Sequence, residues 1–171
     1  VEATEVHLQR LDNIESALLW IQTLSTARLI VTGYGGGYRR FNLDQMLLRF
    51  TNLRHLELDG FDSHFSKHFW TTFLTPKSNL VSLSLGKDFE LIADDFGRAL
   101  KDEKAAPKLK EIRLDVIDIT GGEPHLFDTR EIVEPGWTDD CSFEQASSLE
   151  NDISFRGIKL KGSFKAAILR Q

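Results

Sequence analysis

The chain has 171 residues, 41% of them apolar and 27% charged, which is enough for one domain with a buried core and excludes a disordered tail. Its 21 basic and 26 acidic residues give a net charge of −5, so we expect neither nucleic acid nor a membrane surface as a partner. No apolar run approaches the roughly 20 residues that cross a bilayer. A single cysteine, Cys141, excludes an internal disulfide framework and favours an intracellular protein, cytoplasmic or nuclear.

Six segments along the chain predict short strands that share one apolar spacing. Three of them read L-x-x-L-x-L, and the steps from Leu53 to Leu80 and from Leu80 to Leu109 are 27 and 29 residues. Such regular spacing indicates internal repeats rather than independent motifs. In chain order the units are Ala3-Val6-Leu8, Thr26-Leu29-Val31, Leu53-Leu56-Leu58, Leu80-Leu83-Leu85, Leu109-Ile112-Leu114 and Phe155-Ile158-Leu160.

Stretches with near-helical apolar spacing separate these strands. They cover residues 14–24, 42–50, 65–74 and 92–101. The strands themselves alternate polar and apolar side chains, as in "HLELD" and "SLSLG". This alternation predicts a sheet with helices on one side and water on the other, because strands covered on both faces are continuously apolar.

A glycine-rich segment, residues 33–37, follows the predicted strand "RLIVT" and resembles the phosphate-binding turn of a nucleotide enzyme. Asp59, after the next strand, stands where such a fold places an acid for the ribose. The motif is incomplete, since Tyr38 replaces its third glycine after Gly33 and Gly35. We therefore expect a connecting loop and no cofactor; a nucleotide-dependent oxidoreductase using Gly33, Gly35 and Asp59 is the alternative.

Three further groups suggest chemistry but lack the accompanying residues. His64 and His68 have the spacing of a helical zinc pair, without the glutamate of a zinc protease. Residues 95–97 read "DFG", but no other kinase motif accompanies them. Cys141 lies in an acidic segment, which would raise its thiol pKa, and has no histidine nearby in sequence. We expect no metal site and no catalytic activity.

The interval between the fifth and sixth predicted strands is much longer than the others. Residues 116–152 are acidic and rich in turn-forming residues, which predicts a loop-like insertion. It could be a lid or a partner-binding insertion anchored by Trp137, because aromatic side chains often dominate contact energies. A poorly ordered insertion or a degenerate repeat explains the same composition.

The repeats resemble the leucine-rich-repeat superfamily, and their period with helical returns is similar to the ribonuclease-inhibitor-like and F-box-receptor-like subclass. The positions that carry Asn or Cys in that family are occupied here by Phe61, Asp88, Ile117 and Ser163. The resemblance implies an α/β solenoid with a parallel concave sheet and convex helices. We expect one irregular domain over residues 1–171, with about six units, and a chain that is a piece of a longer protein.

In such a solenoid the alternate strand residues form the concave surface, and repeat surfaces usually bind macromolecules. The expected protein-binding residues include His7, Gln9 and Arg28, and centrally His55, Glu57, Asp59, Ser82, Ser84, Glu111, Arg113, Asp115, Lys159 and Lys161, with Trp137 in the insertion. This strip is acidic at its centre and basic at its C-terminal edge. Resemblance to F-box receptors implies a substrate-recruiting module of a ubiquitin ligase, although no F-box segment is visible.

Overall fold

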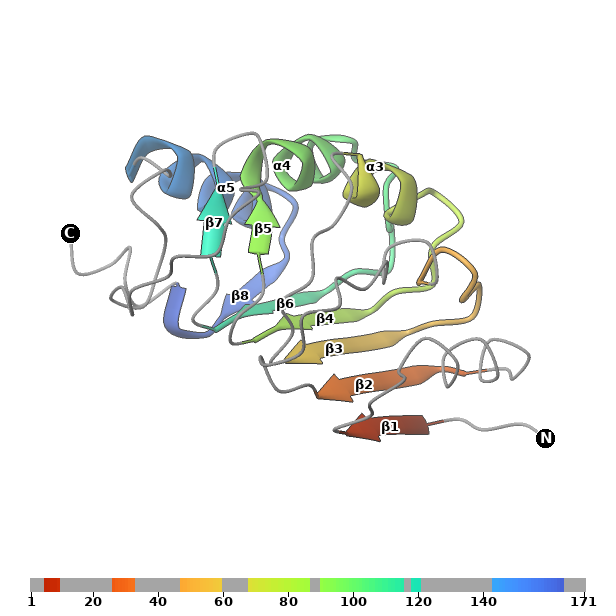
Figure 1. Ribbon diagram of the computed structural model, residues 1–171. Helices are drawn as coiled ribbons and strands as arrows, with labels where there is room; N and C mark the ends of the chain where they lie inside the picture. Colours follow the sequence, from red (N-terminus) through yellow and green to blue (C-terminus); the bar gives the residue numbers. More distant parts are fainter. Residues whose placement is uncertain are drawn as a thin grey trace.

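The computed structural model describes residues 5–9, 26–32, 47–59, 68–86, 90–115, 118–120 and 143–164. Within them the chain forms a six-stranded sheet in which all neighbouring strands are parallel (Figure 1). The strands are β1 (Glu5–Gln9), β2 (Arg28–Thr32), β3 (His55–Asp59), β4 (Ser82–Leu85), β6 (Glu111–Leu114) and β8 (Lys159–Lys161). They lie in the sheet in the order in which they follow along the chain.

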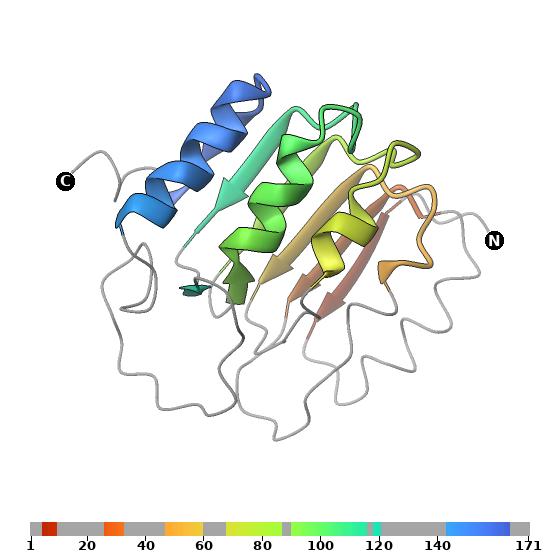
Figure 2. The same cartoon turned by 90° about the horizontal axis from the view of Figure 1, so that it is seen from above.

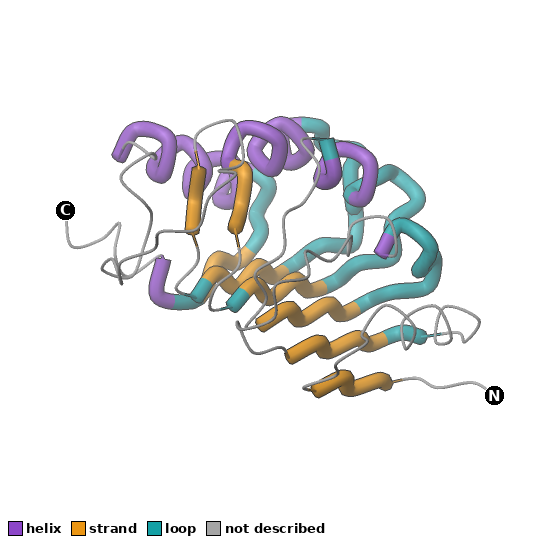
Figure 3. The backbone as a smooth tube through the Cα atoms, viewed as in Figure 1, coloured by secondary structure: helices purple, strands orange, loops and turns teal. Residues whose placement is uncertain are grey.

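Three described helices lie side by side over one face of this sheet, as Figure 2 shows from above. They are α3 (Phe69–Phe73), α4 (Ala93–Lys101) and α5 (Phe143–Phe155). Figure 3 shows the same two layers as purple helices above orange strands. Among the described residues the other face carries no helix. The α/β class, the parallel sheet and the one-sided helical cover are therefore as predicted.

The register of the sheet aligns the repeats leucine by leucine. Leu29 pairs with Leu56, Leu56 with Leu83, and Leu83 with Ile112. Because side chains alternate between the faces of a strand, one register fixes which residues of every strand are buried. The second and third apolar residues of the three central repeat units are all buried in a single cluster: Leu56, Leu58, Leu83, Leu85, Ile112 and Leu114.

The helices close this core from the opposite side. Phe69 and Trp70 of α3 are buried, and the Trp70 ring meets Phe96 of α4 edge-on at 4.9 Å between ring centroids. Ala99 and Leu100 continue the buried face of α4. Helix α5 contributes three buried side chains at helical spacing, Ala146, Leu149 and Ile153.

The last repeat is offset from its predicted position by two residues. Leu160 pairs with Ile112, not with Leu114, so this unit begins at Gly157 instead of Phe155. Phe155 is 80% exposed, which no first leucine of a unit would be. A shift of two residues preserves the alternation of faces, so Leu160 is still buried, as is Ile158.

The loop-like prediction for 116–152 is wrong at both ends of that segment. Residues 143–152 belong to helix α5, and Asp118–Thr120 form strand β7. Strand β7 pairs in parallel with β5 (Glu90–Ile92) as a second, two-stranded sheet that the sequence did not predict. The predicted 65–74 and 92–101 helices correspond to α3 and α4. The 14–24 helix, the 33–37 glycines, His64, Trp137 and Cys141 lie outside the described residues.

Candidate functional site

The face of the sheet opposite the helices is where the alternate strand residues gather, and we call it the open face. The register arranges them in rows that cross the strands. One row reads Glu5, Arg28, His55, Ser82, Glu111 and Lys159, and the next reads His7, Ile30, Glu57, Ser84, Arg113 and Lys161. A third row, at the carboxyl ends of the strands, includes Thr32 and Asp59.

Thirteen of the fourteen expected partner-binding residues belong to the strands of this face or directly follow one, and Trp137 is outside the described residues. His7 and Gln9 come from β1, and Arg28 comes from β2. His55, Glu57 and Asp59 come from β3, and two serines come from β4. The rest come from β6, from its end and from β8: Glu111, Arg113, Asp115, Lys159 and Lys161. Residues more than 100 positions apart in the chain are thereby brought onto one surface.

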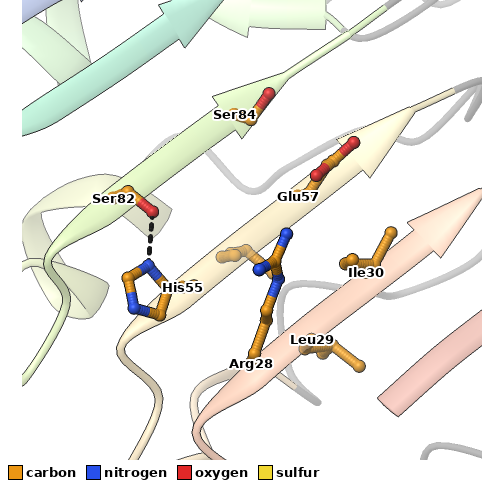
Figure 4. A pocket seen from close by; sticks show the side chains of 8 residues that line it. Arg28, Leu29, Ile30, His55, Glu57, Ser82 and Ser84 are labelled. Atoms are coloured by element: carbon orange, nitrogen blue, oxygen red, sulfur yellow. Dashed lines mark hydrogen bonds between the residues drawn. The ribbon is translucent and has the colours of Figure 1, made fainter. Parts of the chain in front are cut away.

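A shallow hollow with a volume of about 140 Å³ lies over β2, β3 and β4. Figure 4 shows the side chains that line it, with Arg28 and Ile30 on one side and Ser82 and Ser84 on the other. His55 Nδ1 and Ser82 Oγ form a hydrogen bond of 2.7 Å, which holds the imidazole towards β4. Glu57 occupies the strand between Ile30 and Ser84.

The carboxylate of Glu57 is half-buried and forms no hydrogen bond or ion pair with any described residue. Its charge acts through space on Arg113, two strands away. The guanidinium of Arg28 points into the same hollow, in the direction of Glu57 (Figure 4). Its Nε lies 4.0 Å from Glu5 Oε2, a distance at the limit of an ion pair.

The C-terminal third of the open face is held by two ion pairs. Lys161 Nζ lies 2.7 Å from Glu111 Oε2, and this hydrogen bond lowers the pKa of the Glu111 carboxyl. Arg113 Nε donates a hydrogen bond to Asp115, which raises the pKa of the guanidinium. Lys159 is exposed. The basic groups at this edge are therefore partly neutralised by neighbouring carboxylates.

Two aspartates lean over glycines at the carboxyl ends of the strands. A Cβ atom added to Gly86 would lie 2.4 Å from Asp59 Oδ1, so only glycine leaves room for that carboxylate. Asp115 Oδ1 accepts a hydrogen bond from the Ser163 amide at 3.1 Å, beside Gly162 with its φ of 101°. Both carboxylates therefore lie at the carboxyl-terminal end of the open face, and the amide of Ser163 fixes that of Asp115.

Glu5 and Ile30 are among the residues of the open face that sequence reasoning missed. Glu5 Oε1 lies 2.6 Å from His7 Nε2, at the N-terminal edge of the face. Ile30 is an apolar side chain among polar ones and forms one side of the hollow. The signal was present, because the alternation set by Val6 and Leu29 already places both on the polar side.

Of the other candidate motifs, the structure describes Asp95 to Gly97 and His68. Asp95 of "DFG" is buried, and its carboxylate accepts hydrogen bonds from the Trp70 amide and from Thr71 Oγ1. His68 is exposed at the start of α3. The described part of the chain contains no group of three or more His, Cys, Asp or Glu side chains placed to hold a metal. None of its helices is long and apolar enough to cross a membrane.

Comparison of the chain with protein-family models, with curated proteins and with solved structures gave no match.

Proposed function

We propose that this chain is an irregular leucine-rich-repeat solenoid that binds a protein through the open face and has no catalytic activity of its own. The observation that carries the proposal is that face. It offers rows of polar and charged side chains on parallel strands, with the helices packed on the opposite side. Sequential parallel strands with aligned leucines support the solenoid, because each unit covers the core of its neighbour.

The open face suits recognition of a folded partner or an extended segment. It combines carboxylates, guanidinium and ammonium groups, imidazoles and hydroxyls on a rigid sheet, so a bound protein would meet preformed donors and acceptors. Charged groups on such a surface mainly select and orient a partner and raise its association rate. A role as the substrate-recruiting domain of an F-box-type ubiquitin ligase receptor is the finer form of this proposal and rests on the resemblance of the repeats.

Site-specific cross-linking tests the assignment of the face. A photoreactive phenylalanine analogue is placed at Ser84 on β4 in one protein and at Thr72 on α3 in another, and cross-linked partners are identified after irradiation in cells. The partner recovered through position 84 is then purified and titrated with wild type, with Ser84→Trp and with Thr72→Trp. We expect Ser84→Trp to abolish binding and Thr72→Trp to leave it unchanged. The reverse pattern would place the interface on the helices.

Nucleotide binding by residues 33–37 is the enzymatic alternative. We expect no saturable heat when NAD(H) or NADP(H) is titrated into the protein by calorimetry. Micromolar binding that Gly35→Val abolishes would replace the proposed function with an oxidoreductase.

A further inference from the structure

We propose that the hollow over β2, β3 and β4 receives a lysine or arginine side chain of the partner, with its cationic head at Glu57. This inference rests on the proposed function and names the chemistry of its central contact. The occupant follows from the charge, the shape and the lining of the hollow.

Charge is the first reason. The three strands at the middle of the face, β3, β4 and β6 with the residue after it, contribute four carboxylates and one guanidinium, which belong to Glu57, Asp59, Glu111, Asp115 and Arg113. Glu111 is paired with Lys161, Asp115 with Arg113, and Asp59 is held over Gly86. Glu57 alone of these carboxylates faces the hollow. It has no hydrogen-bond or ion-pair partner among the described residues, so a cationic group of a bound partner could form an ion pair with it.

Shape and lining agree with a long basic side chain. A volume of about 140 Å³ accommodates one side chain rather than a cofactor or a nucleotide, whose pockets are usually about 300 Å³ or larger. Ile30 lines the hollow, with 9% of its surface exposed, and supplies an apolar contact for the methylene stem, since such stems pack on apolar surface while their charge stays hydrated. The hydroxyl of Ser84, next to Glu57 in the row, can accept a hydrogen bond from an ammonium or guanidinium group.

Arg28 opposes this occupant and makes the idea testable. Its guanidinium points into the hollow in the direction of Glu57 (Figure 4), so it would repel an incoming cation and attract an anion. Removing its charge should therefore strengthen binding of a basic side chain and weaken binding of an acidic one. The sign of the Arg28 effect distinguishes the two occupants.

The test uses capped amino acids as probes and backbone amide NMR of the full chain. N-acetyl-lysine methylamide and N-acetyl-arginine methylamide are titrated to millimolar concentration, with the glutamine analogue as neutral control and the glutamate analogue as acidic control. We expect saturable shifts for the two basic probes, concentrated at residues 28–30, 55–57 and 82–84. Glu57→Gln should weaken the affinity for the two basic probes about tenfold, the effect of losing roughly one charge-assisted contact. Arg28→Gln should strengthen their affinity.

Glu103→Gln, in the turn after α4, is the matched control and should leave the affinity for every probe unchanged. Saturable binding of the glutamate probe at the same amides, lost in Arg28→Gln, would overturn the inference, as would basic probes that shift no amide of the hollow. A cross-linked partner that binds Glu57→Gln as well as wild type but is lost in Ser84→Trp refutes the basic anchor and leaves the open-face function standing. A cross-linked partner that binds Ser84→Trp as tightly as wild type refutes the proposed binding function of the open face.

Discussion

Thr26 shows how a single residue departs from the repeat pattern. It stands directly before β2 where three other units have Leu53, Leu80 and Leu109, and it is 2% exposed. No described residue offers its Oγ1 a hydrogen bond. A hydroxyl buried without a partner costs about 1–3 kcal/mol, because it loses its water and gains nothing in exchange.

We therefore expect Thr26→Val, which keeps the shape and removes the hydroxyl, to raise the free energy of unfolding by about 1 kcal/mol. Denaturant titration of wild type and variant measures this difference. Thr51→Val, at an exposed threonine four residues before β3, is the control and should change stability little. A loss of stability in Thr26→Val would mean that the hydroxyl has a partner.

At the scale of the element, Asp95 explains how so short a helix as α3 is held in place. Isolated helices of five residues are not stable in water. Asp95 of α4 accepts a hydrogen bond of 2.8 Å from the Trp70 amide, in the first turn of α3, and one of 3.2 Å from Thr71 Oγ1. It thus serves as an N-terminal cap supplied by the next repeat. Gly97 of α4 leaves room for a carboxylate of α5, since a Cβ there would lie 3.0 Å from Asp152 Oδ2.

We expect Asp95→Ala to destabilise the protein by about 1–3 kcal/mol, because it removes the carboxylate that accepts a hydrogen bond from the buried Trp70 amide. Hydrogen exchange at the Trp70 amide should accelerate more than exchange in the sheet. Asp95→Asn, which retains one acceptor oxygen, should lose less. Glu103→Ala controls for removal of a surface charge. Unchanged exchange at Trp70 in Asp95→Ala would contradict the cap.

The strands contribute two rows of buried side chains to the core. Leu58 of β3 and Leu85 of β4 are neighbours in one of these rows. Both are fully buried, and neighbouring helices and strands limit how far the structure can collapse around a cavity. Truncating either leucine to Ala should cost about 2–5 kcal/mol of unfolding free energy. Leu48→Ala, at a leucine that is 41% exposed, is the matched control and should cost much less. Near-neutral stability of both core variants would contradict the register.

The strands and their register could be predicted from the sequence because two periods coincide there. Alternation within each strand assigns the faces, and the L-x-x-L-x-L spacing aligns one strand with the next. Helix α5 was missed because its apolar positions Ala146, Leu149 and Ile153 are few and stand among acidic and hydroxyl residues. The last repeat was placed two residues too early because alternation cannot distinguish registers that differ by two.

The open face could be predicted as a surface, but its hollow could not. Strand alternation identifies which residues lie on that face. It does not show that the His55 ring turns to Ser82, or that Glu57 has no ion-pair partner among the described residues while Glu111 binds Lys161. Those details depend on the rotamers and lengths of side chains on neighbouring strands, which a single sequence does not specify.

At the scale of the whole molecule, strand β8 is the element joined to the sheet by the longest connection. It pairs with β6 through three residues and forms the edge of the sheet. Because a longer segment separates β8 from β6, pairing these two strands loses more loop-closure entropy than adding β3 or β4 to the sheet. The ion pair between Lys161 and Glu111 joins the two strands on the open face.

This ion pair makes the docking of β8 sensitive to acid. The hydrogen bond from Lys161 lowers the pKa of the Glu111 carboxyl below its ordinary value. The pair therefore contributes stability that is fully present above the unfolded pKa and is lost as the pH falls through the folded pKa. Because both side chains are more than one third exposed, we expect the contribution at neutral pH to be at most about 1 kcal/mol. The unfolding free energies of wild type and Glu111→Gln should thus differ at pH 7 and converge below the folded pKa of Glu111.

Denaturant titrations at both pH values measure the convergence, and amide exchange of residues 159–161 measures the docking of β8 directly. High salt at pH 7 should also reduce the difference, because exposed pairs are screened. Glu103→Gln should show no such pH dependence relative to wild type. A difference between wild type and Glu111→Gln that persists well below the folded pKa would show that the glutamate stabilises the sheet edge by packing and not by its charge.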